Sequence, residues 1–147
     1  MISCVLAAFS GLSAQNDTTF VANGNPIIKY KYTADPGAMV HDGKVYIYAG
    51  HDECPPPREH YQLNEWCVFS SPDMKTWTEH PVLLKAKDFS WAKGEAWASQ
   101  VIERDGKFYW YVTVEHKTIP GKSIGVAVSD SPVSVLQSLI ICWVSNG

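Results

Sequence analysis

Hydrophobic side chains recur along the chain in short runs, in which aliphatic and aromatic residues alternate. Lys44–Ala49 has aliphatic side chains at every second position with tyrosines between them, and Lys107–Thr113 is built in a similar way. Because successive side chains of a β-strand point to opposite faces, both segments are predicted to be strands with two apolar faces. Asp-Gly pairs precede them at Asp42 and Asp105, and such a pair is the strongest short signal for a tight hairpin. No stretch shows clear helical periodicity, so an all-β fold is expected.

The two hairpins belong to a longer internal repeat. Residues 39–48 match residues 102–111, and a Ser-Pro turn follows a strand in each unit, at Ser71 and at Ser131. The Asp-Gly turns lie 63 residues apart and the Ser-Pro turns 60 residues apart, so two landmarks agree. The predicted strands are 38–41, 44–49, 65–70 and a short one near Trp77 in the first unit, and 99–103, 107–113 and 124–129 in the second. Sheets that are apolar on both faces must lie between neighbours, as the blades of a β-propeller do.

Composition narrows the class of protein. Of the 147 residues, 46% are hydrophobic and 18% are charged, so the chain is expected to fold. The net charge of −3 and the pI near 5.9 provide no basic surface for nucleic acid or an anionic membrane. No apolar run reaches the roughly 18 residues that cross a bilayer. The six Trp and seven Tyr residues suit pleated sheets, and those that are exposed could form platforms for sugar rings.

The N-terminal residues predict export to a secreted or periplasmic location. Met1–Ala14 has no charged residue and combines an apolar run with small residues, as at the end of a signal peptide, although the usual basic start is missing. A disordered or packed segment is the alternative. In an exported protein Cys54 and Cys67 could form a disulfide across one loop, whereas buried free thiols are the alternative. The cysteines include no CxxC pair, so a structural zinc site is not expected.

Chain direction places the candidate functional residues at one end of the predicted blades. If the Asp-Gly hairpins lie at one end, segments 33–36, 51–64, 89–98 and 114–122 all lie at the other. Carboxylate, imidazole and tryptophan side chains gather there, and such groups could form a sugar site: Asp35, His51, Asp52, Glu53, Trp91, Glu95, Trp97, Glu115 and His116.

Asp35 is the strongest single candidate among them. It precedes Pro36 and is expected to open the innermost strand of the first blade, with its carboxylate in the central well. An ordinary Asp-Pro turn at the start of a strand is the alternative. His51, Asp52 and Glu53 could hydrogen-bond a sugar or form a polar loop. They are not expected to bind a metal, because three consecutive residues of an extended chain cannot all face one ion.

Trp97 could support a sugar ring or pack between the blades. Glu95 is a candidate sugar contact in the same segment, although Glu95, Glu115 and His116 are also typical of solvated loop residues. No cofactor or metal ion is implied by any of these residues.

Four segments together resemble glycoside hydrolase family 43, in particular its arabinoxylan arabinofuranohydrolases and β-xylosidase-like members: Thr33–Glu53, Ser70–His80, Phe89–Lys117 and Ile124–Pro132. The stretch WAKGEAWASQVIE in the third segment is highly specific. The resemblance implies a five-bladed β-propeller and an inverting mechanism with three carboxylates. It implies that Asp35 is the general base, which activates water for attack on the anomeric carbon. In an inverting site the base and the acid lie roughly 6.5–9.5 Å apart, which leaves room for this water.

The resemblance extends over about residues 25–132 and stops short of the other two carboxylates. The general acid Glu and the Asp that tunes its pKa are implied to lie in later blades, and Glu95 stands where family members usually carry Asp. The apolar segment 133–147 departs from the family pattern, which favours a frameshifted or mis-assigned end over a divergent last strand. The expected organisation is a signal peptide at 1–14, two blades of an incomplete propeller at 15–132 and an aberrant tail at 133–147.

Two functions are compatible with these features. The first is a glycoside hydrolase for arabinose- or xylose-containing plant polysaccharides, truncated and inactive as this chain because the acid is missing. The second is a non-catalytic carbohydrate-binding module that uses Trp91, Trp97 and the tyrosines and has no need of Asp35. A metal hydrolase built on His51 and Asp52 is disfavoured.

Overall fold

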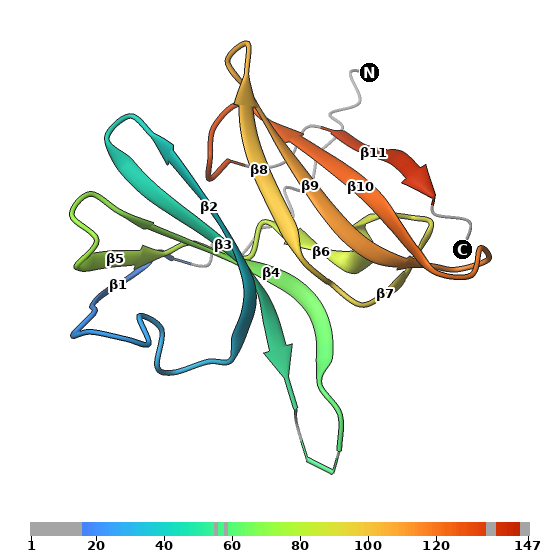
Figure 1. The fold of residues 1–147 in the computed structure, drawn as a ribbon, viewed down its shortest axis with the longest axis horizontal. Helices are drawn as coiled ribbons and strands as arrows, with labels where there is room; N and C mark the ends of the chain where they lie inside the picture. The colour runs from blue at the N-terminus through green and yellow to red at the C-terminus, as the bar shows by residue number, and fades with distance from the viewer. Residues whose placement is uncertain (1–15, 55, 58, 135–137, 145–147) are drawn as a thin grey trace, which may run out of the picture.

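The structure is a computed structural model that describes residues 16–54, 56–57, 59–134 and 138–144. In these residues the chain forms two antiparallel sheets (Figure 1), and the helical structure among them is a single 3₁₀ turn, η1 (Ala86–Asp88). None of the described helical segments is long and apolar enough to span a membrane. The all-β prediction is confirmed.

The first sheet, here called the first blade, contains six strands in the order β1-β5-β4-β3-β2, with β6 beside β4. Its strands are β1 (Thr18–Val21), β2 (Thr33–His41), β3 (Lys44–Glu53), β4 (Gln62–Ser71), β5 (Thr76–Glu79) and β6 (Leu84–Lys85). The four strands predicted in this unit are all present. The sequence pattern did not predict β1, which pairs with β5 along its whole length. This pairing covers a strand edge that would otherwise be open.

The second sheet, the second blade, has the order β11-β10-β9-β7, with β8 also beside β9. Its strands are β7 (Ala92–Gly94), β8 (Ser99–Arg104), β9 (Lys107–His116), β10 (Lys122–Ser129) and β11 (Ser138–Val144). Residues 138–144 thus pair with β10 as the outermost strand. The interpretation of 133–147 as foreign to the family stays a prediction, as do the proposed domain boundaries. Residues 1–14, with the expected signal peptide, lie outside the described residues.

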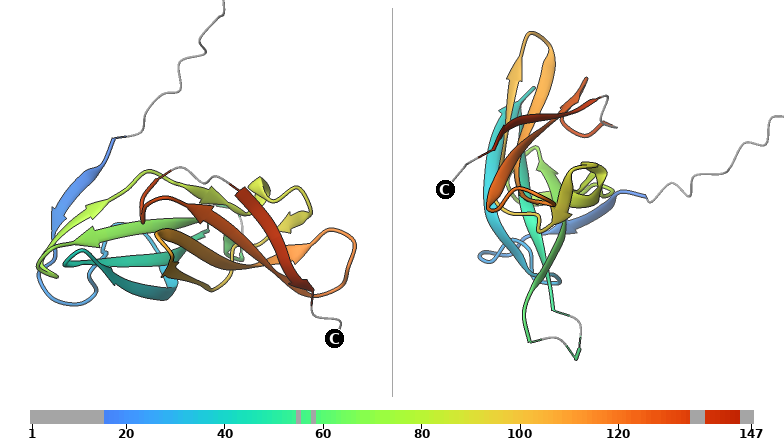
Figure 2. Two further views of the ribbon diagram at one scale, coloured as in Figure 1. Left: turned by 90° about the horizontal axis from the view of Figure 1, so that it is seen from above. Right: turned by 90° about the vertical axis from the view of Figure 1, so that its right-hand side faces the viewer.

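Two strands of the first blade are longer than the sequence pattern predicted. β2 begins at Thr33 rather than at residue 38, because a bulge lets the strand continue through the Asp-Pro pair. Asp35 therefore lies within the strand and does not open it. β3 continues to Glu53 and β4 begins at Gln62, so the expected loop 51–64 is reduced to the tip of a hairpin that projects beyond both sheets (Figures 1 and 2).

The main core lies between the two blades. Tyr48 and Trp66 of the first blade pack on Trp110 of the second, with ring centroids 4.9 Å and 6.2 Å apart. Buried aliphatic side chains surround these rings, among them Val68 and Val112. The alternating pattern of β3 had placed its tyrosines on one face and its aliphatic residues on the other. The sandwiched arrangement confirms that both faces are needed for packing.

A second apolar cluster lies on the other face of the first blade. Cys67, Phe69 and Trp77 are buried there, and side chains from residues 20–28 cover them. Glu79 holds this covering segment in place, since it accepts hydrogen bonds from the side chains of Tyr30 and Lys31. The N-terminal segment thus shields one face of the first blade, which the sequence pattern did not predict.

The cysteines form neither the possible disulfide nor a pair of buried thiols. No disulfide joins Cys54 to Cys67, and the two thiols are not alike, because Cys67 is buried in β4 whereas Cys54 is exposed on the β3–β4 hairpin. The expectation of buried thiols is therefore right for Cys67 and wrong for Cys54. Burial raises the pKa of the Cys67 thiol to about 11, which keeps it protonated at neutral pH.

At Gly37 the inner strands of the two blades, β2 and β8, approach each other closely. A Cβ atom at this position would lie 2.6 Å from the backbone oxygen of Ser99 and 3.0 Å from Oε1 of Gln100. We expect Gly37→Ala to lower the free energy of unfolding by about 1–3 kcal/mol, because β2 and β8 would have to separate. Urea unfolding measures this, with Ala38→Ser at the exposed neighbouring position as a control expected to stay within about 0.5 kcal/mol. Equal stability of Gly37→Ala and the wild type would contradict the close approach.

Candidate functional site

Asp35 lies at a β-bulge in the innermost strand of the first blade. Ala34 pairs with Gly50 and Gly37 with Tyr48, so that two residues of β2, Asp35 and Pro36, face one residue of β3. Asp35 has a φ of 49°, in the left-handed region that Asp tolerates better than most residues. A bulge of this kind turns a side chain out of the regular alternation of the strand. Asp35 is exposed, so its carboxylate is accessible at this bulge.

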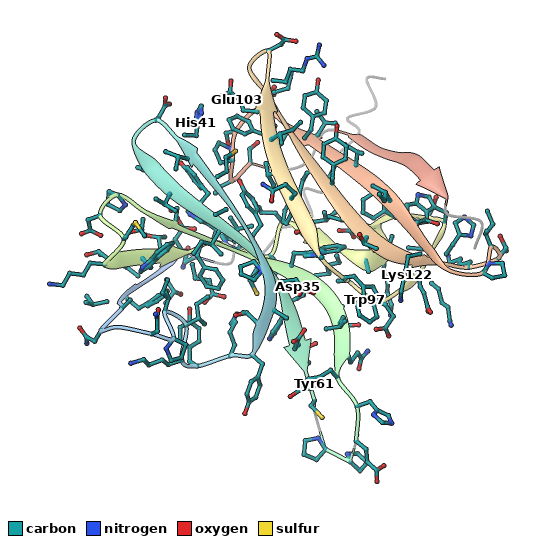
Figure 3. All side chains as sticks on the ribbon, viewed as in Figure 1. Asp35, His41, Tyr61, Trp97, Glu103 and Lys122 are labelled. Atoms are coloured by element: carbon teal, nitrogen blue, oxygen red, sulfur yellow. The ribbon has the colours of Figure 1, made fainter. Side chains whose placement is uncertain are left out.

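Asp52 is the carboxylate that the fold brings to Asp35. Its backbone N–H donates a 3.0 Å hydrogen bond to the carbonyl oxygen of Tyr32, which ties the end of β3 to the start of β2. Partial burial raises the pKa of Asp52, and the negative charge of Asp35 raises it further. Two carboxylates from neighbouring strands thus share one electrostatic environment, at the end away from the Asp-Gly hairpins. Figure 3 places Asp35 near the centre of the molecule and His41 and Glu103 beside those hairpins.

The raised pKa of Asp52 has a consequence for stability. A raised pKa means that the folded protein binds the proton more tightly than the unfolded chain, so the charged form destabilises the fold above about pH 4. We expect Asp52→Asn to raise the melting temperature at pH 7, and this advantage to disappear as the pH falls towards 4. Thermal unfolding across this range measures the difference, with Asp105→Asn at an exposed turn as the control. A difference that is the same at both pH values would contradict the assignment.

His51 lies on the opposite face of β3 from Asp52, since consecutive residues of a strand alternate. Its Nδ1 is 3.2 Å from Oε1 of Glu65, and the other oxygen of Glu65 is 3.4 Å from the Lys85 ammonium. Glu53 accepts a 3.0 Å hydrogen bond from Asn64 of the neighbouring strand. The structure thus ties His51 to Glu65 and does not bring it to Asp35. Its contact with a sugar stays a prediction.

Trp97 lies between β7 and β8 of the second blade, and its backbone contacts both blades. Its N–H donates to the carbonyl oxygen of Thr113 at 2.9 Å, and its carbonyl oxygen accepts a 2.7 Å hydrogen bond from Nε1 of Trp66. The Trp97 side chain is 38% exposed, so the backbone forms the junction and the ring remains accessible. The backbone of Trp97 therefore connects the two blades. Its ring remains accessible, as a platform for a sugar ring would be.

Lys122 holds the Trp97 ring from one side. Its ammonium lies 3.9 Å from the ring centroid, a cation–π contact, and Glu115 is 3.8 Å from the same ammonium and 3.1 Å from that of Lys93. The hydrogen bond from Lys93 and the charges of both lysines lower the pKa of Glu115. Figure 3 shows Trp97 and Lys122 together on the second blade, to one side of Asp35. Glu115 therefore has a local structural role.

The remaining candidates also make local contacts. Trp91 stacks on His116 with ring centroids 5.5 Å apart, and Nδ1 of His116 accepts hydrogen bonds from the backbone N–H groups of Thr118 and Ile119. Glu95 has a left-handed φ of 65° in the β7–β8 segment that carries Trp97. Its role as a sugar contact stays a prediction. Within the described residues, no three His, Cys, Asp or Glu side chains come together as metal ligands would.

Three residues that hold the candidate residues in place were not predicted from the sequence. Glu65, Trp66 and Lys122 hold His51, the Trp97 carbonyl and the Trp97 ring, respectively. Each lies 14 to 31 residues along the chain from the residue that it holds. No local spacing in the sequence therefore indicates the contact. A polar residue in an otherwise apolar strand, such as Glu65 in β4, was the available signal.

Comparison with known proteins defines the class. Residues 23–138 match the family described as glycosyl hydrolases family 43, and the chain belongs to this family. Xylosidase/arabinosidase 43A of Humicola insolens is 37% identical over 115 residues, which are 73% of this chain and 35% of that protein. The arabinoxylan arabinofuranohydrolase of Bacillus subtilis (strain 168) is 30% identical over 154 residues, covering 88% of this chain and 29% of that protein.

Solved structures support the same assignment. The crystal structure of a β-xylosidase/α-arabinofuranosidase from a compost microbial metagenome, in complex with xylotriose, superposes with a TM-score of 0.70 at 36% identity. The superposition covers 82% of this chain and 38% of that enzyme. The chain therefore spans about a third of the length of the proteins it matches, as the 35% coverage of the Humicola insolens enzyme also indicates. Its two sheets are part of the β-propeller of this family.

Proposed function

We propose that this chain supplies the general-base part of an inverting glycoside hydrolase site that acts on arabinose- or xylose-containing plant polysaccharides. The family membership and the xylosidase and arabinofuranohydrolase names of its relatives support this substrate class. The observation that carries the proposal is the bulge at Asp35, which turns an exposed carboxylate out of the innermost strand.

In the proposed mechanism Asp35 accepts a proton from a water molecule as the water oxygen attacks the anomeric carbon. The bond from this carbon to the leaving oxygen breaks, and a separate acid must protonate that oxygen. The negative charge of the neighbouring Asp52 favours the positive charge that develops on the sugar ring. The accessible Trp97 ring would form one wall beside the sugar.

The acid is proposed to lie in the part of the relatives that this chain does not match. General acid catalysis typically contributes about 10²–10⁴-fold, so the 147-residue chain by itself is expected to hydrolyse little. Two samples test the proposal with aryl xyloside and aryl arabinofuranoside: the chain alone, and a chimera in which residues 23–132 replace the matching segment of the compost enzyme. An inactive chain and an active chimera are expected. Turnover by the chain alone would overturn the proposal that the general acid lies outside this chain.

The exposed Trp97 ring also supports the second candidate, a module that binds carbohydrate without turnover. Its signature would be sugar binding in calorimetry that is weakened by Trp97→Ala and unaffected by Asp35→Asn, together with an inactive chimera.

We also propose that the protein is exported, on the basis of the uncharged apolar residues 1–14. N-terminal sequencing of exported material, with a first residue at or near Gln15, tests this proposal.

A further inference from the structure

Two exposed tyrosines lie next to the candidate site and have no part in the proposed hydrolysis at Asp35. Tyr32 precedes β2 and is 71% exposed, and Tyr61 precedes β4 and is 60% exposed. Their ring centroids are 6.5 Å apart at an angle of 65°. Large aromatic rings gain free energy by burial, so a pair held together in solvent is a surface available to a ligand.

The strand pairing places Tyr32 on the same face of the first blade as Asp52. Thr33 pairs with His51, so Tyr32 lies opposite Asp52, and the hydrogen bond between Asp52 N–H and the Tyr32 oxygen confirms the alignment. Directly opposite residues of an antiparallel pair share a face of the sheet. Asp52 in turn feels the charge of Asp35. In Figure 3, Tyr61 lies on the projecting β3–β4 hairpin, beyond Asp35.

The distance along the chain keeps Tyr32 close to Asp35. Tyr32 is three residues from Asp35, which corresponds to at most about 10 Å in an extended strand. A chain of a few linked sugars could therefore contact Asp35 and the tyrosines at the same time. The carboxylates of Asp35 and Asp52 would repel an anionic polymer on this face.

We propose that Tyr32 and Tyr61 form a binding surface for the backbone of a neutral polysaccharide outside the Asp35 site. Because the rings meet at 65°, one ring stacks on the C–H face of a sugar while the other presents its edge and hydroxyl to the hydroxyl groups of the same sugar. The proposal rests on the proposed function for the neutral, pentose-rich nature of the polymer. It goes beyond it in assigning a separate subsite, which affects long substrates and not single sugars.

The test measures binding of the 147-residue chain to soluble arabinoxylan and to xylose by calorimetry and affinity electrophoresis. The double variant Tyr32→Ala/Tyr61→Ala is expected to bind the polymer about tenfold more weakly, with unchanged binding of xylose. The double variant Tyr32→Phe/Tyr61→Phe keeps both rings and is expected to retain most of the affinity. Met74→Ala removes an equally exposed apolar side chain from the β4–β5 turn and is expected to bind like the wild type.

Three results would overturn the proposal: a double alanine variant that binds arabinoxylan like the wild type, a wild-type chain that binds no arabinoxylan, or tighter binding of anionic polygalacturonate. Thermal unfolding of each variant checks that the fold is intact, since both tyrosines are exposed. Asp35→Asn separates this proposal from the proposed function. That variant is expected to keep the tyrosine-dependent binding of the polymer even where the chimera loses turnover.

Discussion

Replacing Asp35 with Asn in the chimera is expected to lower kcat by about 10²–10⁴-fold with little change in KM, because Asn keeps the shape of the side chain but cannot take a proton from water. The bulge at Asp35 and Pro36 is set by backbone pairing of β2 with β3, so the substitution should leave the geometry intact. Steady-state kinetics on aryl xyloside and aryl arabinofuranoside measure the effect.

A second variant distinguishes a missing base from a disturbed fold. Asp35→Gly leaves space for a small carboxylate, and added formate is expected to restore part of the turnover by taking the same proton. Asp105→Asn, at the Asp-Gly turn of the second blade, is the matched control and should retain full activity. A chimera with Asp35→Asn that keeps its kcat would exclude Asp35 as the base.

Trp66→Ala is expected to lower the free energy of unfolding by about 3–5 kcal/mol, which is a large fraction of the roughly 5–15 kcal/mol that stabilises an ordinary domain. The Trp66 side chain is fully buried, packs on Trp110 across the blade interface and donates the hydrogen bond that holds the Trp97 carbonyl. Removing it leaves a cavity between the blades and an unpaired carbonyl. Urea unfolding measures the change.

Trp66→Phe isolates the hydrogen bond from the packing. It keeps most of the ring volume but leaves the Trp97 carbonyl without its donor, for which a loss of about 1–3 kcal/mol is expected. Met74→Ala at an exposed turn should change stability by no more than about 0.5 kcal/mol. A loss below 1 kcal/mol for Trp66→Ala would show that the blades are held together by other contacts.

Local features of the sequence were sufficient to predict seven of the eleven strands in the described residues. The Asp-Gly turns at Asp42 and Asp105 and the alternation in β3 and β9 depend on neighbouring residues, and the structure confirms both hairpins. Four strands went unpredicted: β1, β6, β7 and β11. These are outer or short strands, which become strands only because a longer neighbour offers its free backbone groups. Such pairing is decided by contacts far apart in the chain.

In the candidate site, too, some features could be predicted from the sequence and others depend on the fold. The sequence predicted Asp35 and Trp97 as functional candidates, and the geometry explains their accessibility through a bulge and a blade junction. It could not predict that His51 turns towards Glu65 while Asp52 turns towards Asp35, because the face that each residue takes depends on the register of β3 with its neighbours. The cation–π contact of Lys122 with Trp97 depends on the packing of β10 beside the β7–β8 segment.

The sequence by itself determined the family, the repeat of antiparallel strands and the chemical type of the central residue, because these are encoded in short motifs and in a period of two residues. The tertiary structure decided which carboxylate accompanies Asp35, how Trp97 is held and where the two tyrosines meet. The physical reason is that strand register, bulges and blade packing bring together residues that are distant in the chain. A shift of one residue in any of them would turn the same side chains to the other face.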